Sequence, residues 1–151
     1  MRFLILMVIV ALAGCGGRQE PPAAAKSALY AGETAELRVL INRYADLYDV
    51  PRPLVHRVVQ RESTYRPGAR NGPYYGLMQI LPQTARTMGH RGPPESLLDA
   101  ETNLKYAVKY LRGAWLLSDG NYDTAVGWYA RGYYYEAKRR GMLVQTGLRQ
   151  G

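Results

Sequence analysis

Apolar residues that recur every three or four positions, in runs interrupted by proline and glycine, restrict the fold of this 151-residue chain more than any other feature. Such spacing places side chains on one face of an α-helix, and the first run lies within residues 36–48. Its apolar positions are Leu37, Leu40, Ile41, Tyr44, Leu47 and Tyr48. The run predicts an amphipathic helix with one face in the core.

The same spacing predicts several helices further along the chain. Pro51 and Pro53 suit the first turn of one, Pro82 begins another, and Asp99 or Thr102 can cap a third. The predicted helices span about 51–62, 82–89, 99–118, 123–129 and 133–140. No stretch alternates polar and apolar residues for long enough to predict a strand, so we expect a single domain of mainly α class.

The N-terminus has the form of an export signal. Met1-Arg2 precedes eleven apolar residues, 3–13, which are too few for a membrane-spanning helix of roughly 20 residues. We therefore expect residues 1–14 to be a signal peptide. Leu12-Ala13-Gly14-Cys15 resembles the lipobox of bacterial lipoproteins, which implies that Cys15 carries a lipid. The alternative is an ordinary signal peptide with a cysteine near its cleavage site.

The residues after this signal and the composition of the chain give four further expectations. Cys15 is the only cysteine, so the chain forms no internal disulfide. Residues 15–32 are mostly Gly, Pro, Ala and polar residues and predict a lipid-anchored flexible tether, which leaves 33–151 as the folded domain. Gly16 rather than Asp after Cys15 implies, by resemblance, the periplasmic face of the outer membrane. The net charge of +8 suits an anionic partner, and export makes nucleic acid an unlikely one.

Glu62 is the residue that points most directly to chemistry. It lies four residues after Val58 and eight after Leu54, on the apolar face of its predicted helix. Partial burial would raise the pKa of this carboxyl and allow it to donate a proton near neutral pH. Alternatively, it ends the helix or pairs with a nearby arginine, and the residues available for that pairing are Arg61, Arg66 and Arg70.

Glu62-Ser63 belongs to a series of blocks that resembles a known family. The other blocks are Gly76-Leu77-Met78-Gln79 with its continuation to Ala85, then 97–104, Tyr110-Leu111 and Trp128-Tyr129-Ala130-Arg131-Gly132. Together they resemble family 1 of the soluble lytic transglycosylases over about 54–140. The resemblance implies a lysozyme-like helical domain of the goose type.

The family's pattern implies roles for individual side chains. Glu62 matches the sole catalytic acid/base, and the substrate-binding residues would be Ser63, Met78, Gln79, Tyr110 and Tyr129. Two of these have an equally simple structural role: Ser63 can satisfy the end of its own helix, and Tyr110 can pack between helices. Tyr129 matches the Tyr of the family's Ala-Tyr-Asn-Ala-Gly block. The six tyrosines near these blocks can stack on sugars or build the core, and both roles stay open.

Two departures from the family's pattern bear on the expected activity. Ala130 replaces the Asn of the Ala-Tyr-Asn-Ala-Gly block, and Pro73-Tyr74 replaces the usual Gly-Ala. We expect these changes to affect rate and specificity more than activity itself. His56 and His90 are too isolated to predict a metal site, and we expect no metal and no cofactor.

The reaction implied by the resemblance is cleavage of peptidoglycan strands between N-acetylmuramic acid and N-acetylglucosamine, with formation of 1,6-anhydromuramic ends. The substrate partner would be peptidoglycan, and the membrane would be reached through Cys15. Two alternatives stay open. A muramidase would hydrolyse the same bond, and a weakly active lipoprotein would chiefly bind the wall, to which Ala130 lends some support.

Overall fold

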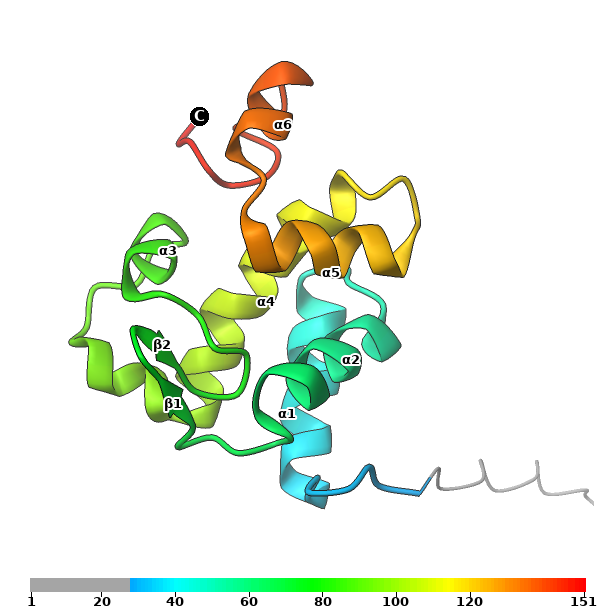
Figure 1. Cartoon of the computed structure of the whole chain (residues 1–151), viewed down its shortest axis with the longest axis vertical. Helices are drawn as coiled ribbons and strands as arrows, with labels where there is room; N and C mark the ends of the chain where they lie inside the picture. The colour runs from blue at the N-terminus through cyan, green and yellow to red at the C-terminus, as the bar shows by residue number, and fades with distance from the viewer. Residues whose placement is uncertain (1–27) are drawn as a thin grey trace, which may run out of the picture.

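The computed structural model describes residues 28–151, and this part of the chain is mainly helical, as predicted (Figure 1). The elements run in the order α1 (Ala35–Leu47), α2 (Arg52–Ser63), β1 (Arg70–Asn71), β2 (Tyr74–Tyr75), α3 (Pro82–Thr87), η1 (Pro94–Leu98), α4 (Ala100–Leu116), α5 (Tyr122–Arg131) and α6 (Tyr134–Arg139). Within the described residues, no helix is both long and apolar enough to cross a bilayer.

Side-chain caps fix where three of the helices begin. The oxygens of Thr34, Asp99 and Asn121 accept hydrogen bonds from the backbone N–H groups at the starts of α1, α4 and α5. These bonds satisfy amides that have no partner inside the helix. In α2 and α3 a proline occupies the first turn, where its missing N–H costs nothing. Of the two caps proposed for α4, Asp99 is the one observed.

The core is built around α4, which runs diagonally through the molecule behind the other elements in Figure 1. α1, α3, α5 and η1 all contact it, while α2 packs on α1 and α5. The fully buried side chains of α4 include Leu104, Ala107, Val108 and Leu111. The predicted stripe of α2, Leu54, Val55, Val58 and Val59, is completely buried and confirmed.

Leu47 was predicted to lie on the core face of α1, but its side chain is exposed to solvent. Its side chain is 63% exposed, whereas Ile41, Tyr44 and Ala45 of the same helix are buried. At about 100° per residue, the centre of the face formed by the buried residues Leu37, Ile41, Tyr44 and Ala45 lies between Leu37 and Ile41. Leu47 is turned roughly 100° away from it, so the prediction for this residue is wrong.

A small antiparallel hairpin lies between α2 and α3, where the sequence predicted neither a helix nor a strand. Arg70 pairs with Tyr75 and Asn71 with Tyr74, and Gly72 in the turn has a positive φ of 56°. The sequence analysis predicted no strand because each strand is two residues long, which is too short to show an alternating pattern of polar and apolar residues. The hairpin and α3 lie on one side of α4 in Figure 1, opposite α1 and α2.

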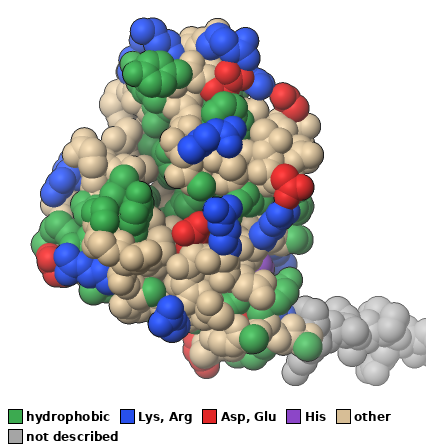
Figure 2. Space-filling model, in the orientation of Figure 1, with side chains coloured by type: hydrophobic (Ala, Val, Ile, Leu, Met, Phe, Trp, Pro, Cys, Tyr) green, Lys and Arg blue, Asp and Glu red, His purple; other side chains and the backbone are tan. Residues whose placement is uncertain are grey.

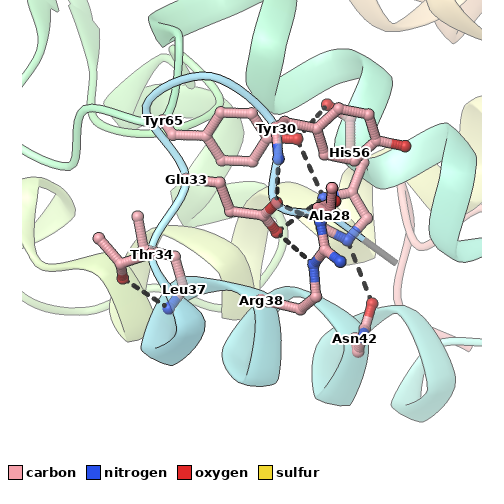
Figure 3. Close-up of polar contacts among 9 residues, drawn as sticks. All are labelled: Ala28, Tyr30, Glu33, Thr34, Leu37, Arg38, Asn42, His56 and Tyr65. Atoms are coloured by element: carbon pink, nitrogen blue, oxygen red, sulfur yellow. Dashed lines mark hydrogen bonds and ion pairs between the residues drawn. The ribbon is translucent and has the colours of Figure 1, made fainter. Parts of the chain in front are cut away.

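The predicted signal peptide 1–14, the predicted lipidation residue Cys15 and residues 16–27 of the predicted tether lie outside the described residues. Within residues 28–32, Tyr30 packs on the folded domain. The Tyr30 ring stacks on Tyr65 with centroids 5.9 Å apart and lies 5.3 Å from the ring of His56. Figure 3 shows this contact beside the buried pair of Glu33 and Arg38.

Candidate functional site

A cleft of about 580 Å³ lies between the C-terminal end of α2, the hairpin with the segment that follows it, and the C-terminal half of α5. Figure 2 looks onto this face, where an acidic group lies beside basic ones near the middle. The lining residues are Arg61, Glu62, Asn71, Tyr74, Gln79, Ile80, Leu81, Thr84, Tyr110, Tyr129, Ala130, Arg131 and Gly132. Segments far apart in the sequence therefore meet around one hollow.

Glu62 contributes the only carboxylate among the lining residues of the described chain. Its side chain is 23% exposed, and the Oε1 atom lies 3.5 Å from Nε of Arg61. Burial raises the pKa of Glu62, and the charge of Arg61 offsets only part of that rise. Of the three arginines considered as partners, Arg61 is the one that forms an ion pair within the described residues. Glu62 thus combines access from the cleft with a pKa raised in the direction that favours the protonated carboxyl.

The Gly76–Gln79 segment is held in place by Asn103, a completely buried residue in the first turns of α4. Its Nδ2 donates hydrogen bonds to the carbonyl oxygens of Tyr75 and Leu97, both at 2.8 Å, and its Oδ1 accepts one from the Met78 amide at 3.0 Å. Gly76 has φ +74°, and a Cβ there would overlap Asn103 and the Leu97 carbonyl. Only glycine fits this close approach.

Met78 and Gln79, both predicted to line the cleft, lie in different surroundings. Met78 is fully buried and is not among the lining residues. Gln79 does line the cleft, in a left-handed conformation with φ +48°. Its Nε2 donates to the carbonyl oxygens of Ala69 at 3.1 Å and Gly76 at 2.9 Å, so within the described chain its Oε1 is the atom without a partner.

Tyr110 and Tyr129 form one wall of the cleft, as an aromatic cluster with Tyr133. The ring of Tyr110 lies 4.7 Å from that of Tyr133 and 5.5 Å from that of Tyr129. The Tyr129 hydroxyl donates to the Met78 carbonyl oxygen at 2.8 Å, and that of Tyr133 to the Tyr110 carbonyl oxygen at 2.8 Å. The Tyr110 hydroxyl makes no hydrogen bond within the described chain, and it faces Gly132 of the cleft.

These tyrosines remain neutral at ordinary pH. Burial raises the pKa of Tyr110 to about 12 and raises that of Tyr129 further, where the negative charge of Glu62 adds to the effect. A neutral hydroxyl can donate a hydrogen bond to a sugar oxygen. Because the Tyr129 hydroxyl is already bound to Met78, Tyr110 is the better placed of the two to donate to a ligand.

Ser63 lies beneath the surface rather than in the cleft. It is 2% exposed, its Oγ donates to the Val59 carbonyl oxygen at 3.3 Å, and the same atom accepts from the Arg66 amide at 3.2 Å. Thr64 and Tyr65, which follow it, both have positive φ. The alternative in which Ser63 satisfies the end of its helix therefore describes its contacts.

Six lining residues carry no role in the sequence analysis: Asn71, Ile80, Leu81, Thr84, Arg131 and Gly132. They come from the hairpin, the segment that leads into α3, α3 itself and the end of α5, whose positions around a common hollow depend on tertiary packing. Of the six clustered tyrosines, Tyr75, Tyr129 and Tyr133 are buried and Tyr74 lines the cleft. Tyrosine therefore does build part of the core, and stacking on sugars stays a prediction for Tyr74 at the cleft.

The two histidines lie away from the cleft. His56 contacts Asn42 and Tyr65, and His90 contacts Ser96. Over residues 28–151 there is no group of three His, Cys, Asp or Glu side chains placed to hold a metal ion.

The cleft of this helical domain presents one half-buried carboxyl among tyrosines and amides, groups that can exchange a proton and hydrogen bonds with a ligand. The family described as the transglycosylase SLT domain matches residues 39–140, and the chain belongs to this family. Membership supports a lytic transglycosylase activity on peptidoglycan in general terms. No solved structure matches the chain.

Proposed function

We propose that the chain is a peptidoglycan lytic transglycosylase that cleaves the β-1,4 bond between N-acetylmuramic acid and N-acetylglucosamine and leaves 1,6-anhydromuramic ends. The observation that carries this proposal is Glu62, half-buried in the cleft with a raised pKa. Burial favours the protonated form of this carboxyl, and a protonated carboxyl is the group that a glycosidic oxygen needs in order to leave.

In the first step Glu62 donates its proton to the glycosidic oxygen. The bond from C1 of the muramic residue to this oxygen breaks, and N-acetylglucosamine leaves with a free 4-hydroxyl group. The positive charge that develops at C1 is stabilised by the acetamido group of the same muramic residue. Because the substrate supplies this stabilisation, the enzyme needs no nucleophile of its own.

In the second step the Glu62 carboxylate acts as a base. It accepts the proton of the C6 hydroxyl of the muramic residue while O6 forms a bond to C1. The product is the 1,6-anhydro sugar, Glu62 is protonated again, and no water is consumed. The residue thus returns to its starting state within one turnover.

The lining of the cleft favours this reaction over hydrolysis. Hydrolytic glycosidases generally use two carboxylates, about 5 to 9.5 Å apart, on either side of the scissile bond. In the described part of the chain no second Asp or Glu lines the cleft, whereas Gln79, Tyr74 and Tyr110 can bind sugar hydroxyl or acetamido groups. The only acid in the cleft must therefore serve as both acid and base.

The test is digestion of purified peptidoglycan sacculi by the full chain, with mass spectrometry of the released muropeptides. Wild type should release anhydromuramic products, and Glu62→Gln should lose about 10²–10⁴-fold in rate, as expected for a positioned acid/base. Glu95→Gln, which makes the same change at an exposed acid of η1, is the matched control. Reducing muramic ends, or near-normal turnover by Glu62→Gln, would overturn the proposal.

We also propose that the protein is exported and anchored through a lipid on Cys15 to the periplasmic face of the outer membrane. The support is the sequence of residues 1–16 alone. Cell fractionation of wild type and Cys15→Ala, with a radiolabelled fatty acid, tests it. Label and protein should occur together in the outer-membrane fraction for wild type only, and an unlabelled, soluble wild type would contradict the anchor.

A further inference from the structure

The cleft contains more positive than negative charge. Two arginines, Arg61 and Arg131, line it, and Glu62 is the only acid among the lining residues of the described chain. Arg61 has Glu62 at 3.5 Å, whereas Arg131 forms no ion pair with any described residue. Arginines on neighbouring surfaces differ, since Arg57 pairs with Asp123 and Arg140 with Asp119. Arg131 therefore contributes an uncompensated cation to the cleft.

Contacts along α5 hold the guanidinium of Arg131 in a defined place. Its Cζ lies 4.1 Å from the centre of the Trp128 ring, a cation–π distance. Its Nη1 lies 2.7 Å from the position that a Cβ on Gly127 would take, so the group folds back over that glycine. Gly127 and Trp128 precede Arg131 by four and three residues, which places all three on one helix face. These two contacts orient the guanidinium without the help of a ligand.

A guanidinium in this state suits a carboxylate. Its planar set of N–H donors matches two carboxylate oxygens, and stacking on an aromatic ring leaves the donors at its edge free. N-acetylglucosamine carries no charge. The muramic residue carries a lactyl group on O3, which ends in a carboxylate or continues into a stem peptide that has carboxylates of its own.

We propose that Arg131 binds a carboxylate on the lactyl branch of a muramic residue and thereby makes the cleft selective for peptidoglycan over uncharged glycans. This inference rests on the proposed function, because it takes peptidoglycan as the substrate. In the Ala-Tyr-Asn-Ala-Gly block that residues 128–132 resemble, the position of Arg131 is an alanine. The guanidinium is therefore a feature of this chain and not of the block.

Binding measurements separate this interaction from turnover. The full chain carrying Glu62→Gln is titrated by calorimetry with tetrasaccharides of alternating N-acetylmuramic acid and N-acetylglucosamine. Three probes are used: stem-free sugars with lactyl carboxylates, the same sugars with these groups converted to methylamides, and sugars that bear stem peptides. In this background Arg131→Gln is compared with Arg149→Gln, which removes the same charge from an exposed residue that does not line the cleft.

Arg131→Gln should weaken binding of the carboxylate probes about tenfold, as loss of a charged hydrogen bond predicts, and leave the methylamide probe unchanged. Arg149→Gln should alter none of them. An effect on the stem-free sugar identifies the lactyl carboxylate, and an effect confined to the stem-bearing sugar identifies a stem carboxylate. Equal weakening of all three probes, or no weakening of any, would overturn the proposal.

Gly127→Ala provides a second variant, because its Cβ displaces the guanidinium without removing the charge. It should weaken binding of the carboxylate probes as Arg131→Gln does, and thermal unfolding shows whether both variants fold. The proposed function is read separately from the sugar ends that wild type releases. Binding that depends on Arg131 without anhydro products would overturn the reaction and leave this inference standing.

Discussion

Replacing Asn103 by alanine removes three hydrogen bonds from the base of the cleft at once. The change leaves the Leu97 carbonyl oxygen and the Met78 amide without partners in a fully buried place, and the Tyr75 carbonyl oxygen keeps only its bond from the Ile80 amide. Each buried group left unsatisfied costs about 1–3 kcal/mol, and the better helix propensity of alanine returns roughly 0.5 kcal/mol. We therefore expect a loss of about 4 kcal/mol in the free energy of unfolding.

Chemical denaturation of the full chain measures this loss, and Asn42→Ala is the matched control. Asn42 is half-buried and bonds through one atom to Nε2 of His56, away from the cleft. It should cost about 1 kcal/mol, in line with one hydrogen bond. A loss below about 1 kcal/mol for Asn103→Ala, with an unchanged denaturant slope, would refute the view that Asn103 holds the segment in place.

Asn103→Asp sharpens the same test through its dependence on pH. The carboxylate keeps an acceptor for the Met78 amide but places a negative charge against two carbonyl oxygens, so its pKa should rise in the folded state. A carboxyl whose pKa is higher when folded loses stability as pH increases through that interval. The variant should therefore be most stable in acid.

Digestion of sacculi at a temperature where Asn103→Asp is folded should fall roughly tenfold or more, because the Gln79 segment loses its support.

Three further predictions test other parts of the structure. Gly113→Ala should destabilise the fold by about 1–3 kcal/mol, because the added Cβ overlaps the hydroxyl of Tyr133. In denaturation experiments the double variant with Tyr133→Phe should recover part of this loss, because the overlapping oxygen is gone. Burial raises the pKa of Glu62, so wild type should lose stability relative to Glu62→Gln as pH rises through that raised pKa. Identical dependence of the two melting temperatures on pH would contradict this prediction. Burial of Glu33 opposes ionisation, but its hydrogen bond from Arg38 lowers the pKa below 4.5. Wild type should therefore be more stable than Glu33→Gln above that pH, and thermal melting should show this advantage vanish as pH falls through the lowered pKa of the folded state.

The helices could be predicted from sequence because local features fix them. Capping by Asp99 and the prolines at the starts of α2 and α3 act within one turn of the residues that they position. Burial periodicity in α2 likewise depends on residues three and four apart. The hairpin escaped prediction because its pairing joins strands of two residues, which leave no pattern.

Side-chain orientation in the segment from Gly76 to Gln79 follows a different rule. Positive φ at Gly76 and Gln79 breaks any helical or strand period, so neighbouring residues take unrelated directions. Met78 therefore points into the core while Gln79 faces the cleft. The identity of these residues was informative through the family resemblance, whereas their orientation depends on a hydrogen-bonding residue 25 positions away, Asn103.

Arg131 shows how a residue can escape prediction even when its block is recognised. A resemblance carries over roles only at matching positions, and residue 131 differs from the alanine of the block. What gives it a place in the cleft is the combination of Gly127, which leaves room for the guanidinium, and Trp128, which supports it. These contacts lie within one helix, so the spacing Gly-Trp-x-x-Arg is a signal that a sequence could reveal in other chains. Its meaning depends on the cleft toward which α5 turns that face, because an arginine stacked on a surface tryptophan elsewhere would meet only water.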